Sequence, residues 1–355
     1  MGRDDLLAQT VSDDISIVSP SLFEVRKTPG VMQLLSKCLA PLGNRNFSAS
    51  VLKDYITCPL KFYLSFVRQL NEDDEVSEGV DAAQFGDILH QAICSLYKGC
   101  EGKIVEASML EKYIDKNNRA VQDAISQAFD RVMNLRGREL EGYNLLVSQI
   151  LVNYVIETLR HDKELCPFEY HAGECKQNFV FEVSDHLAVR IKCIYDRLDS
   201  PITGKNSDTV RIVDYKTGNS QHGNKLNFPS IEDFFGNEGK GSKEAFQVML
   251  YCLLLEHASP EELMLFHLET RPTRVVPHLY FVRDFQPNRR VSTVLKEKTD
   301  RTIKELEDFS PYRDDFNRRL ISLFEEIYDP DIPFVQCKDT RACVWCPFAN
   351  LCKRN

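Results

Sequence analysis

The pattern of apolar and polar positions predicts helices in the first part of the chain. Apolar residues follow helical spacing from Ala82 to Tyr97 and again across 105–160. A shorter helix is expected from Val51 to Ile56, because Ser48 precedes it as a capping residue and Cys58-Pro59 interrupts it. The acidic stretch 71–81 is typical of a surface loop.

The pattern changes near residue 177, where strands are expected. The strands are predicted at 179–183, 187–195, 210–215 and 276–282. A glycine-rich polar stretch, 218–242, predicts a long flexible connection. Lys243 to Leu255 is apolar on nearly every side, as in a buried helix, and 296–327 is expected to be helical. This order predicts an α/β fold with a mixed central sheet flanked by helices.

Composition narrows the class of protein. Of 355 residues, 43% are hydrophobic and 27% charged, which is ordinary for a globular chain. No apolar run approaches the roughly 18 residues of a membrane span, and the first residues do not resemble a secretory signal. We therefore expect a cytoplasmic protein without membrane contact. The net charge of −9 argues against coating nucleic acid by bulk charge, so DNA binding would need a local groove and metal ions.

The end of the third predicted strand carries candidate chemistry. Asp214 and Lys216 are two positions apart on a strand, so they share a face, whereas Tyr215 offers its backbone carbonyl. Asp196 ends the preceding predicted strand and would lie near Asp214 if the two strands pair. Two carboxylates and a carbonyl are ligands that Mg²⁺ or Mn²⁺ prefers. A neighbouring lysine can orient the attacking water and offset negative charge in the transition state of phosphodiester hydrolysis. An isolated D-x-K of this kind is usually an exposed charge pair.

These residues resemble the nuclease domain of RecB/AddB-type helicase–nucleases, in the PD-(D/E)xK superfamily. The match consists of Asp196, the run Val213-Asp214-Tyr215-Lys216-Thr217-Gly218, and Gln247 with Tyr251 one helical turn later. The resemblance implies a restriction-endonuclease-like core. It also implies the catalytic residues Asp196, Asp214, Lys216, Gln247 and Tyr251.

The same resemblance extends the predicted metal site. Phe85-Gly86-Asp87-Ile88-Leu89-His90 is similar to a family phrase that supplies a metal-binding histidine, so His90, Asp196, Asp214 and the Tyr215 carbonyl are the implied ligands. Glu174, before the first predicted strand, is a possible supporting residue; the alternative is a surface role. Cys193 and Tyr195 depart from the family pattern, which places a glycine and an isoleucine there, so strand packing near Asp196 is in question.

Cysteines near the end of the chain form a second motif. Cys343, Cys346 and Cys352 have the spacing C-x2-C-x5-C, which supplies three thiolates for a metal site. By resemblance to AddB-type nucleases, Cys58 is the fourth ligand of a [4Fe–4S] cluster. Cys337 is a nearby competitor, and zinc or free thiols are the alternatives.

The predicted organisation is a lead segment, 1–46, linking to an upstream region, and a nuclease domain, 47–355. The domain would contain a helical insertion at about 99–170 and a cysteine tail at 337–355. Candidate phosphate contacts are Lys61, Arg68, Lys225, Lys243, Arg271 and Arg274.

The predicted function is metal-dependent DNA hydrolysis in double-strand-break repair, as an exonuclease. No Walker-type phosphate-binding motif is present, so the resemblance implies helicase regions upstream or in a partner subunit. Two alternatives remain open. One is a stand-alone exonuclease of the CRISPR-associated type, and the other is a non-catalytic module that binds DNA ends.

Overall fold

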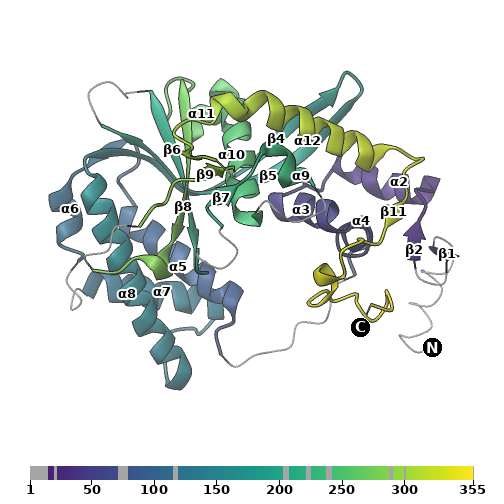
Figure 1. Cartoon of the computed structure of the whole chain (residues 1–355). Coiled ribbons are helices and arrows are strands. Elements are labelled where there is room, and N and C mark those ends of the chain that lie inside the picture. Colours follow the sequence, from purple (N-terminus) through teal and green to yellow (C-terminus); the bar gives the residue numbers. More distant parts are fainter. Residues whose placement is uncertain are drawn as a thin grey trace.

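A five-stranded mixed sheet forms the centre of the computed structural model (Figure 1). The structure describes residues 15–19, 22–70, 79–114, 119–202, 208–220, 225–236, 242–287, 291–299 and 301–354. The order in the sheet is β3 (Lys103–Val105), β4 (Phe168–Ser184), β5 (Leu187–Pro201), β6 (Thr209–Lys216) and β8 (Arg274–Phe281). Neighbouring strands run antiparallel except β6 and β8, which are parallel.

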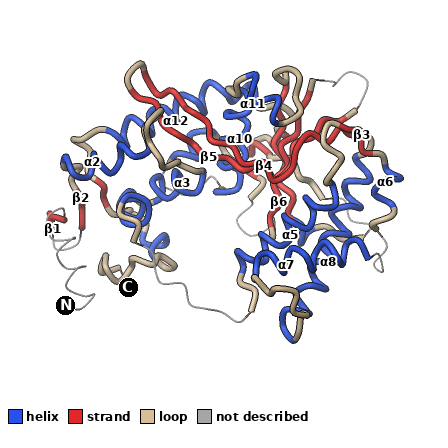
Figure 2. The backbone as a smooth tube through the Cα atoms, turned by 180° about the vertical axis from the view of Figure 1, so that it is seen from behind, coloured by secondary structure: helices blue, strands red, loops and turns tan. Residues whose placement is uncertain are grey.

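Helices cover both faces of this sheet. One face packs against α5 (Ala82–Tyr97), α7 (Arg119–Met133) and α8 (Gly142–Leu165). The other packs against α3 (Ala49–Thr57), α10 (Lys243–Glu256) and α12 (Arg313–Tyr328). Figure 2 shows the two groups of helices from behind. Side chains along β6 alternate between the two cores, with Ile212 in one and Val213 in the other, because successive strand residues point to opposite faces.

Smaller elements complete the described chain. They are β1 (Ile15–Ser19), β2 (Leu22–Val25), α2 (Pro29–Leu35), α4 (Pro59–Phe62), a π-helical turn (Tyr63–Val67), α6 (Ala107–Glu111), β7 (Asn227–Phe228), α9 (Ile231–Phe235), α11 (Pro260–Leu265), β9 (Lys296–Lys298), β10 (Ile303–Glu305) and β11 (Phe334–Val335). Short 3₁₀ turns lie at Ser36–Cys38, Val282–Asp284, Ser310–Tyr312 and Thr340–Cys343. None of the helices in the described ranges is long and apolar enough to cross a lipid bilayer.

The predicted fold class is confirmed: the molecule is α/β, with a curled mixed sheet between helices. The helix predicted from Ala82 to Tyr97 has those bounds, and Asp81 caps it by accepting a hydrogen bond from the Gln84 backbone N–H at 2.8 Å. Cys193 fits the sheet without disturbance, since it is fully buried in β5 and pairs with Gln177.

Several predicted boundaries were wrong. The hairpin strands are longer than expected, so Asp196 lies inside β5 and Glu174 inside β4. Polar residues along the first half of β4, such as the buried His171 and the half-buried Glu174, interrupt its apolar alternation and hide its strand pattern. Strand β3, which pairs with β4, was missed within the predicted helical insertion.

Two further segments differ from expectation. The described parts of 218–242 contain β7 and α9, so this stretch is not simply a connection. Residues 296–298 and 303–305 are strands, not helix; β9 pairs with β7 on one side and with β10 on the other in a small sheet, and only 313–328 is the expected helix. Few apolar residues mark β9 and β10, which is why their sequence resembles a solvated helix.

Residues 22–46 of the lead segment are packed into the molecule. Strand β2 pairs with β11, which places Val25 opposite Phe334. Val25, Val31, Leu35 and Cys38 are buried in the same core as Phe47. The apolar residues of this segment have no strong period because a short strand, a short helix and a turn follow one another closely.

A buried network of charges joins α5 and α8 to the sheet. Arg197 on β5 donates to Asp162 on α8 at 2.7 Å and to Asp199 at 2.6 Å. Arg211 on β6 donates to the other oxygen of Asp199 at 2.5 Å, and the Tyr97 hydroxyl on α5 donates to Asp162 at 2.7 Å. Because Arg197, Asp162 and Asp199 are essentially inaccessible to water, each charge depends on its partners.

Replacing Arg197 by leucine is expected to destabilise the fold by about 3–5 kcal/mol, because it leaves two buried carboxylates short of a partner. The free energy of unfolding would be measured by urea titration. Arg318→Leu is the control, since Arg318 and its partner Asp315 are both exposed and this pair is expected to contribute about 1 kcal/mol or less. Equal losses in the two variants would contradict the role given to the network.

Candidate functional site

Six side chains from five elements meet where α5 and α10 flank the sheet. Helix α5 supplies His90, β4 supplies Glu174 and β5 supplies Asp196. Strand β6 ends with Asp214 and Lys216, and α10 supplies Gln247. Elements from both helical groups therefore contribute to one site.

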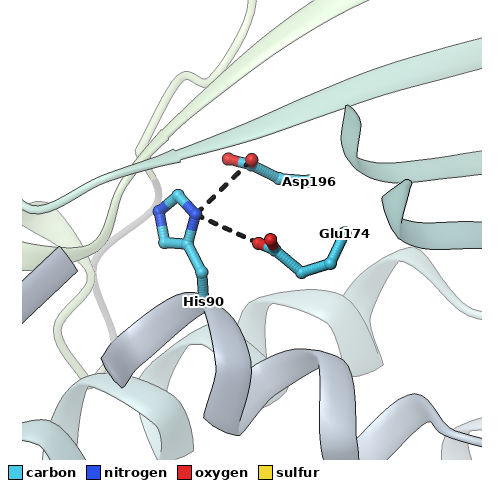
Figure 3. A group of neighbouring side chains, drawn as sticks. All are labelled: His90, Glu174 and Asp196. Atoms are coloured by element: carbon cyan, nitrogen blue, oxygen red, sulfur yellow. Dashed lines mark ion pairs between the residues drawn. The ribbon is translucent and has the colours of Figure 1, made fainter. Parts of the chain in front are cut away.

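His90, Glu174 and Asp196 form the tightest group of possible metal ligands in the described part of the chain (Figure 3). One ligand atom from each residue lies within 4.8 Å of those of the other two. The His90 Nδ1 atom is 3.3 Å from Glu174 Oε1 and 3.4 Å from Asp196 Oδ1. An imidazole nitrogen and two carboxylates make a mixed nitrogen–oxygen site that suits a divalent ion such as Mn²⁺.

Glu174 reaches this group through an unusual backbone conformation. Gly173 pairs with Arg197 and Cys175 with Tyr195, so Glu174 occupies the position opposite Asp196. Its φ angle of 48° is left-handed, which is uncommon for a residue other than glycine and costs on the order of 1–3 kcal/mol. Such conformations are concentrated at functional sites, and here the conformation accompanies a carboxylate that faces His90.

A backbone carbonyl fixes the orientation of the His90 ring. His90 Nε2 lies 3.0 Å from the Tyr215 carbonyl oxygen, so Nε2 carries the proton and donates it. Burial alone would lower the pKa of His90, but the carboxylates of Asp196 and Glu174 raise this pKa well above its usual range. In the metal-free protein the histidine is therefore an imidazolium, which occupies the place of a cation between two carboxylates.

Asp214, Lys216 and Gln247 form a second group beside the first. Lys216 Nζ is 2.7 Å from Asp214 Oδ2 and donates to Gln247 Oε1 at 3.1 Å. The Gln247 amide donates to Asp214 Oδ1 and to the Tyr251 hydroxyl, each at 3.1 Å. The predicted helix face of Gln247 and Tyr251 thus contacts the predicted strand end, although Asp214 lies outside the three-residue group.

Burial and crowding give the carboxylates different pKa values. Burial raises the pKa of Asp214 to about 6, with a contribution from Asp196 and against the opposing effect of Lys216. Burial acts on Asp196 in the same direction, but His90, Lys216 and the Tyr215 N–H, which donates to Asp196 at 2.8 Å, lower its pKa overall. The pKa of Lys216 is raised despite burial, because Asp214 and Asp196 favour its charged form. Lys216 is therefore a fixed positive charge at neutral pH.

The basic residues suggested as phosphate contacts are dispersed. Lys225 is close to the site. Its ammonium group lies beside Gly218, two residues after Lys216, where an added Cβ would be 3.3 Å from it, and Lys225 pairs with Glu244. Lys243 is the first, exposed residue of α10. Lys61 lies in α4 and pairs with Asp54, whereas Arg68 follows the π-helical turn. Arg271 and Arg274 lie near the start of β8, at the opposite end of the sheet from Lys216.

The structure also gathers the predicted cysteine ligands from both ends of the chain. Burial raises the pKa of Cys352, and the nearby thiols of Cys58, Cys346 and Cys343 act in the same direction. Cys337 belongs to the same cluster: its sulfur is 3.7 Å from that of Cys343, and burial together with Cys58 and Cys343 raises its pKa to about 12. The resemblance did not assign a role to this fifth cysteine.

Sequence reasoning understated the place of Glu174 and missed the charge network beneath the site. No local sequence pattern marked Glu174 as a site residue, because the strand was predicted to begin at residue 179 and β4 begins at Phe168. Arg197 and Asp199 stand two apart on β5 and so share a face, and with Asp162 they are buried. In a single sequence, charges at this spacing are more typical of an exposed strand face.

Asp214 should make the metal-free protein lose stability as the pH rises. Folding raises the pKa of Asp214 from 3.8 to about 6. The stabilisation from the protonated carboxyl group is therefore complete below pH 3.8, the pKa in the unfolded chain, and is lost as the pH rises through about 6. In EDTA, the Tm of the wild type minus that of Asp214→Asn is expected to fall between about pH 4 and about pH 7. Calorimetry of both proteins tests this, and a pH-independent difference would contradict it.

The chain is similar in sequence to known nucleases. The profile of the PD-(D/E)XK nuclease superfamily matches residues 46–353. A relative from Carboxydothermus hydrogenoformans, named as one subunit of an ATP-dependent helicase/deoxyribonuclease, is 27% identical over 206 residues. That alignment covers 54% of this chain and 18% of the relative, so the shared region is less than a fifth of that protein. Because the superfamily profile matches most of the chain, the protein belongs to the PD-(D/E)XK nuclease superfamily.

Proposed function

We propose that the protein is a metal-dependent deoxyribonuclease that hydrolyses phosphodiester bonds at the site formed by α5, β4, β5, β6 and α10. The observation that carries this proposal is the meeting of two groups in a nuclease-superfamily chain. One group, His90, Glu174 and Asp196, offers metal ligands. The other, Asp214, Lys216 and Gln247, places a carboxylate and a fixed ammonium charge side by side.

The donor atoms fit a divalent ion such as Mg²⁺ or Mn²⁺. Apart from their ion pairs with His90 and Lys216, Glu174 Oε1 and Asp214 Oδ2 are buried without a hydrogen-bond partner among the described residues. Buried carboxylate oxygens normally have partners, so these two have free capacity for a cation. His90, Glu174 and Asp196 would hold the ion with Asp214 beside them, while the Tyr215 carbonyl orients the histidine ring.

The chain's own residues then perform three tasks. A bound divalent ion supplies positive charge at the phosphodiester and favours deprotonation of water. Lys216 remains protonated, so it offsets negative charge that develops on the phosphate and does not act as a general base. Gln247 holds Lys216 and Asp214 in fixed geometry through both ends of its amide, and Tyr251 accepts the second amide hydrogen.

The DNA substrate and the repair context are proposed from the comparison. The relative's name combines a deoxyribonuclease with an ATP-dependent helicase. We infer that this chain is likewise the nuclease part of an AddB-like helicase–nuclease that degrades DNA ends as an exonuclease in double-strand-break repair. The relative favours this over a stand-alone exonuclease of the CRISPR-associated type.

Asp214→Ala and Lys216→Ala are each expected to reduce cleavage of linear DNA in Mg²⁺ or Mn²⁺ by about 100-fold or more, because each removes a charge that the transition state requires. The measurement is loss of end-labelled DNA over time. Asp185→Ala and Lys192→Ala, which change exposed residues of the neighbouring β4–β5 hairpin, are matched controls and should retain activity.

Unchanged cleavage in both Asp214→Ala and Lys216→Ala would overturn the assignment of this site. Binding of DNA ends without any metal-dependent cleavage by the wild type would instead favour a non-catalytic end-binding module. The expected loss requires that the variants remain folded, so their thermal unfolding should be compared with that of the wild type.

We also propose that Cys58, Cys343, Cys346 and Cys352 bind a [4Fe–4S] cluster. Support comes from the gathering of thiols that are far apart in sequence, at the start of α4 and in the last residues described. Burial raises the pKa of Cys346 and Cys352, so the pocket disfavours free thiolates unless a cation compensates them. A cluster there would join the two ends of the domain and stabilise the fold.

Protein purified without oxygen is expected to be brown and to contain iron and sulfide in equal amounts. Cys343→Ala and Cys346→Ala should lose the iron, whereas Cys94→Ala, which changes a helical cysteine outside the cluster, should retain it. Cys337→Ala should also retain iron if Cys337 only neighbours the ligands. Colourless protein with one zinc per chain would contradict the cluster.

A further inference from the structure

The cysteine tail, Cys337 to Arg354, presents a large aromatic side chain to solvent. Trp345, the only tryptophan of the chain, is 93% exposed. Its neighbours Val344 and Leu351 are 67% and 50% exposed. Tryptophan is usually highly buried, and exposed apolar groups that lie together often mark an interaction surface. The metal chemistry proposed above makes no use of this side chain.

The local fold holds Trp345 in this outward position. Trp345 lies between Cys343 and Cys346, and the Cys346 N–H donates to the Cys343 carbonyl at 3.1 Å. The next turn is closed by the Ala349 N–H, which donates to the Cys346 carbonyl at 3.0 Å. Cys343 and Phe348 are buried on either side of the turn. The exposed ring thus stands on an anchored turn.

The segment that carries the aromatic side chain is rich in positive charge. The tail carries four basic residues, Lys338, Arg341, Lys353 and Arg354, against the single acid Asp339, whereas the whole chain has a net charge of −9. Lys338, Arg341 and Lys353 are exposed, and Arg341 also pairs with Asp339 at 2.7 Å. In Figure 1 the tail lies beside α4 and β11, and Phe348 packs into the core of α3, α10 and α12, on the other face of the sheet from α5.

An exposed aromatic ring on a segment with an excess of basic side chains matches the chemistry of single-stranded nucleic acid. Bases stack on aromatic rings, and lysine and arginine contact the phosphates. A protein partner that covered only Val344, Trp345 and Leu351 would not explain the local excess of positive charge.

We propose that Trp345 is a stacking platform for a base of single-stranded DNA, and that Lys338, Arg341 and Lys353 contact the adjoining phosphates. This inference rests on the proposed function, because it assumes that the substrate is DNA. Trp345 would bind the strand outside the metal site and is not a catalytic residue. Stacking of this kind contributes about tenfold in affinity for each base.

The intrinsic fluorescence of the protein reports on this contact, since Trp345 is the sole tryptophan. The Asp214→Ala protein in EDTA would be titrated with an oligothymidylate, so that cleavage does not interfere. Saturable quenching that weakens with salt is expected. In a second measurement, the anisotropy of a labelled oligothymidylate, Trp345→Ala should bind about tenfold more weakly, and Trp345→Phe close to the parent.

Tyr143→Ala is the matched control, because Tyr143 on α8 is an aromatic residue that is 61% exposed but lies far from the tail in sequence. Its affinity should not change. Lys338→Ala with Lys353→Ala should weaken binding and reduce its dependence on salt. Oligonucleotide binding without quenching, with Trp345→Ala unaffected, would overturn the proposal, as would the absence of any binding; the first result would favour a protein-contact surface.

Failure of this proposal is distinguishable from failure of the proposed nuclease function. Unchanged cleavage in Asp214→Ala would reject the proposed nuclease site, whereas quenching of Trp345 fluorescence by the oligothymidylate would still support binding of the strand at Trp345. Loss of quenching with normal metal-dependent cleavage would reject Trp345 and retain the nuclease.

Discussion

The ion network around Arg197 is the constraint on which the site depends. Arg197 follows Asp196 on β5, and Val213, which pairs with Arg197, precedes Asp214 on β6. Through Asp162 the same guanidinium is connected to α8 and to the Tyr97 hydroxyl of α5, seven residues after His90. The helix that carries the histidine and the strand that carries the aspartate are therefore held by one buried carboxylate. Moving either element would separate a buried charge from its partner, so the network fixes the geometry of the two elements.

Some residues of the site could be predicted from the sequence, and others could not. Asp214, Lys216, Gln247 and Tyr251 follow the periods of a strand and a helix, and the structure places them in contact as those periods predict. Glu174 could not be placed, because its position opposite Asp196 depends on long-range strand pairing and on a left-handed backbone that no local pattern encodes. Their roles in catalysis stay predictions, since geometry alone does not measure activity.

The fold shows the same division. The amphipathic helix at 82–97 and the buried strand β6 were predictable, because burial imposes a strong pattern on their residues. The short strands β9 and β10 have almost no apolar face and owe their structure to pairing with each other and, for β9, with β7. The buried charges of Arg197, Asp162 and Asp199 were not foreseen for a related reason: only their mutual contact in three dimensions makes their burial favourable.

The pairing of β2 with β11 has a practical consequence for dissecting the protein. The superfamily match begins at residue 46, and that residue is an obvious place to start a shortened expression clone. Such a clone would lack Val25 and its strand, leave one edge of β11 without its partner, and uncover the apolar surface beneath Val31 and Leu35. The boundary of sequence similarity and the boundary of autonomous folding differ here by at least two dozen residues, and a soluble fragment should retain α2 and β2.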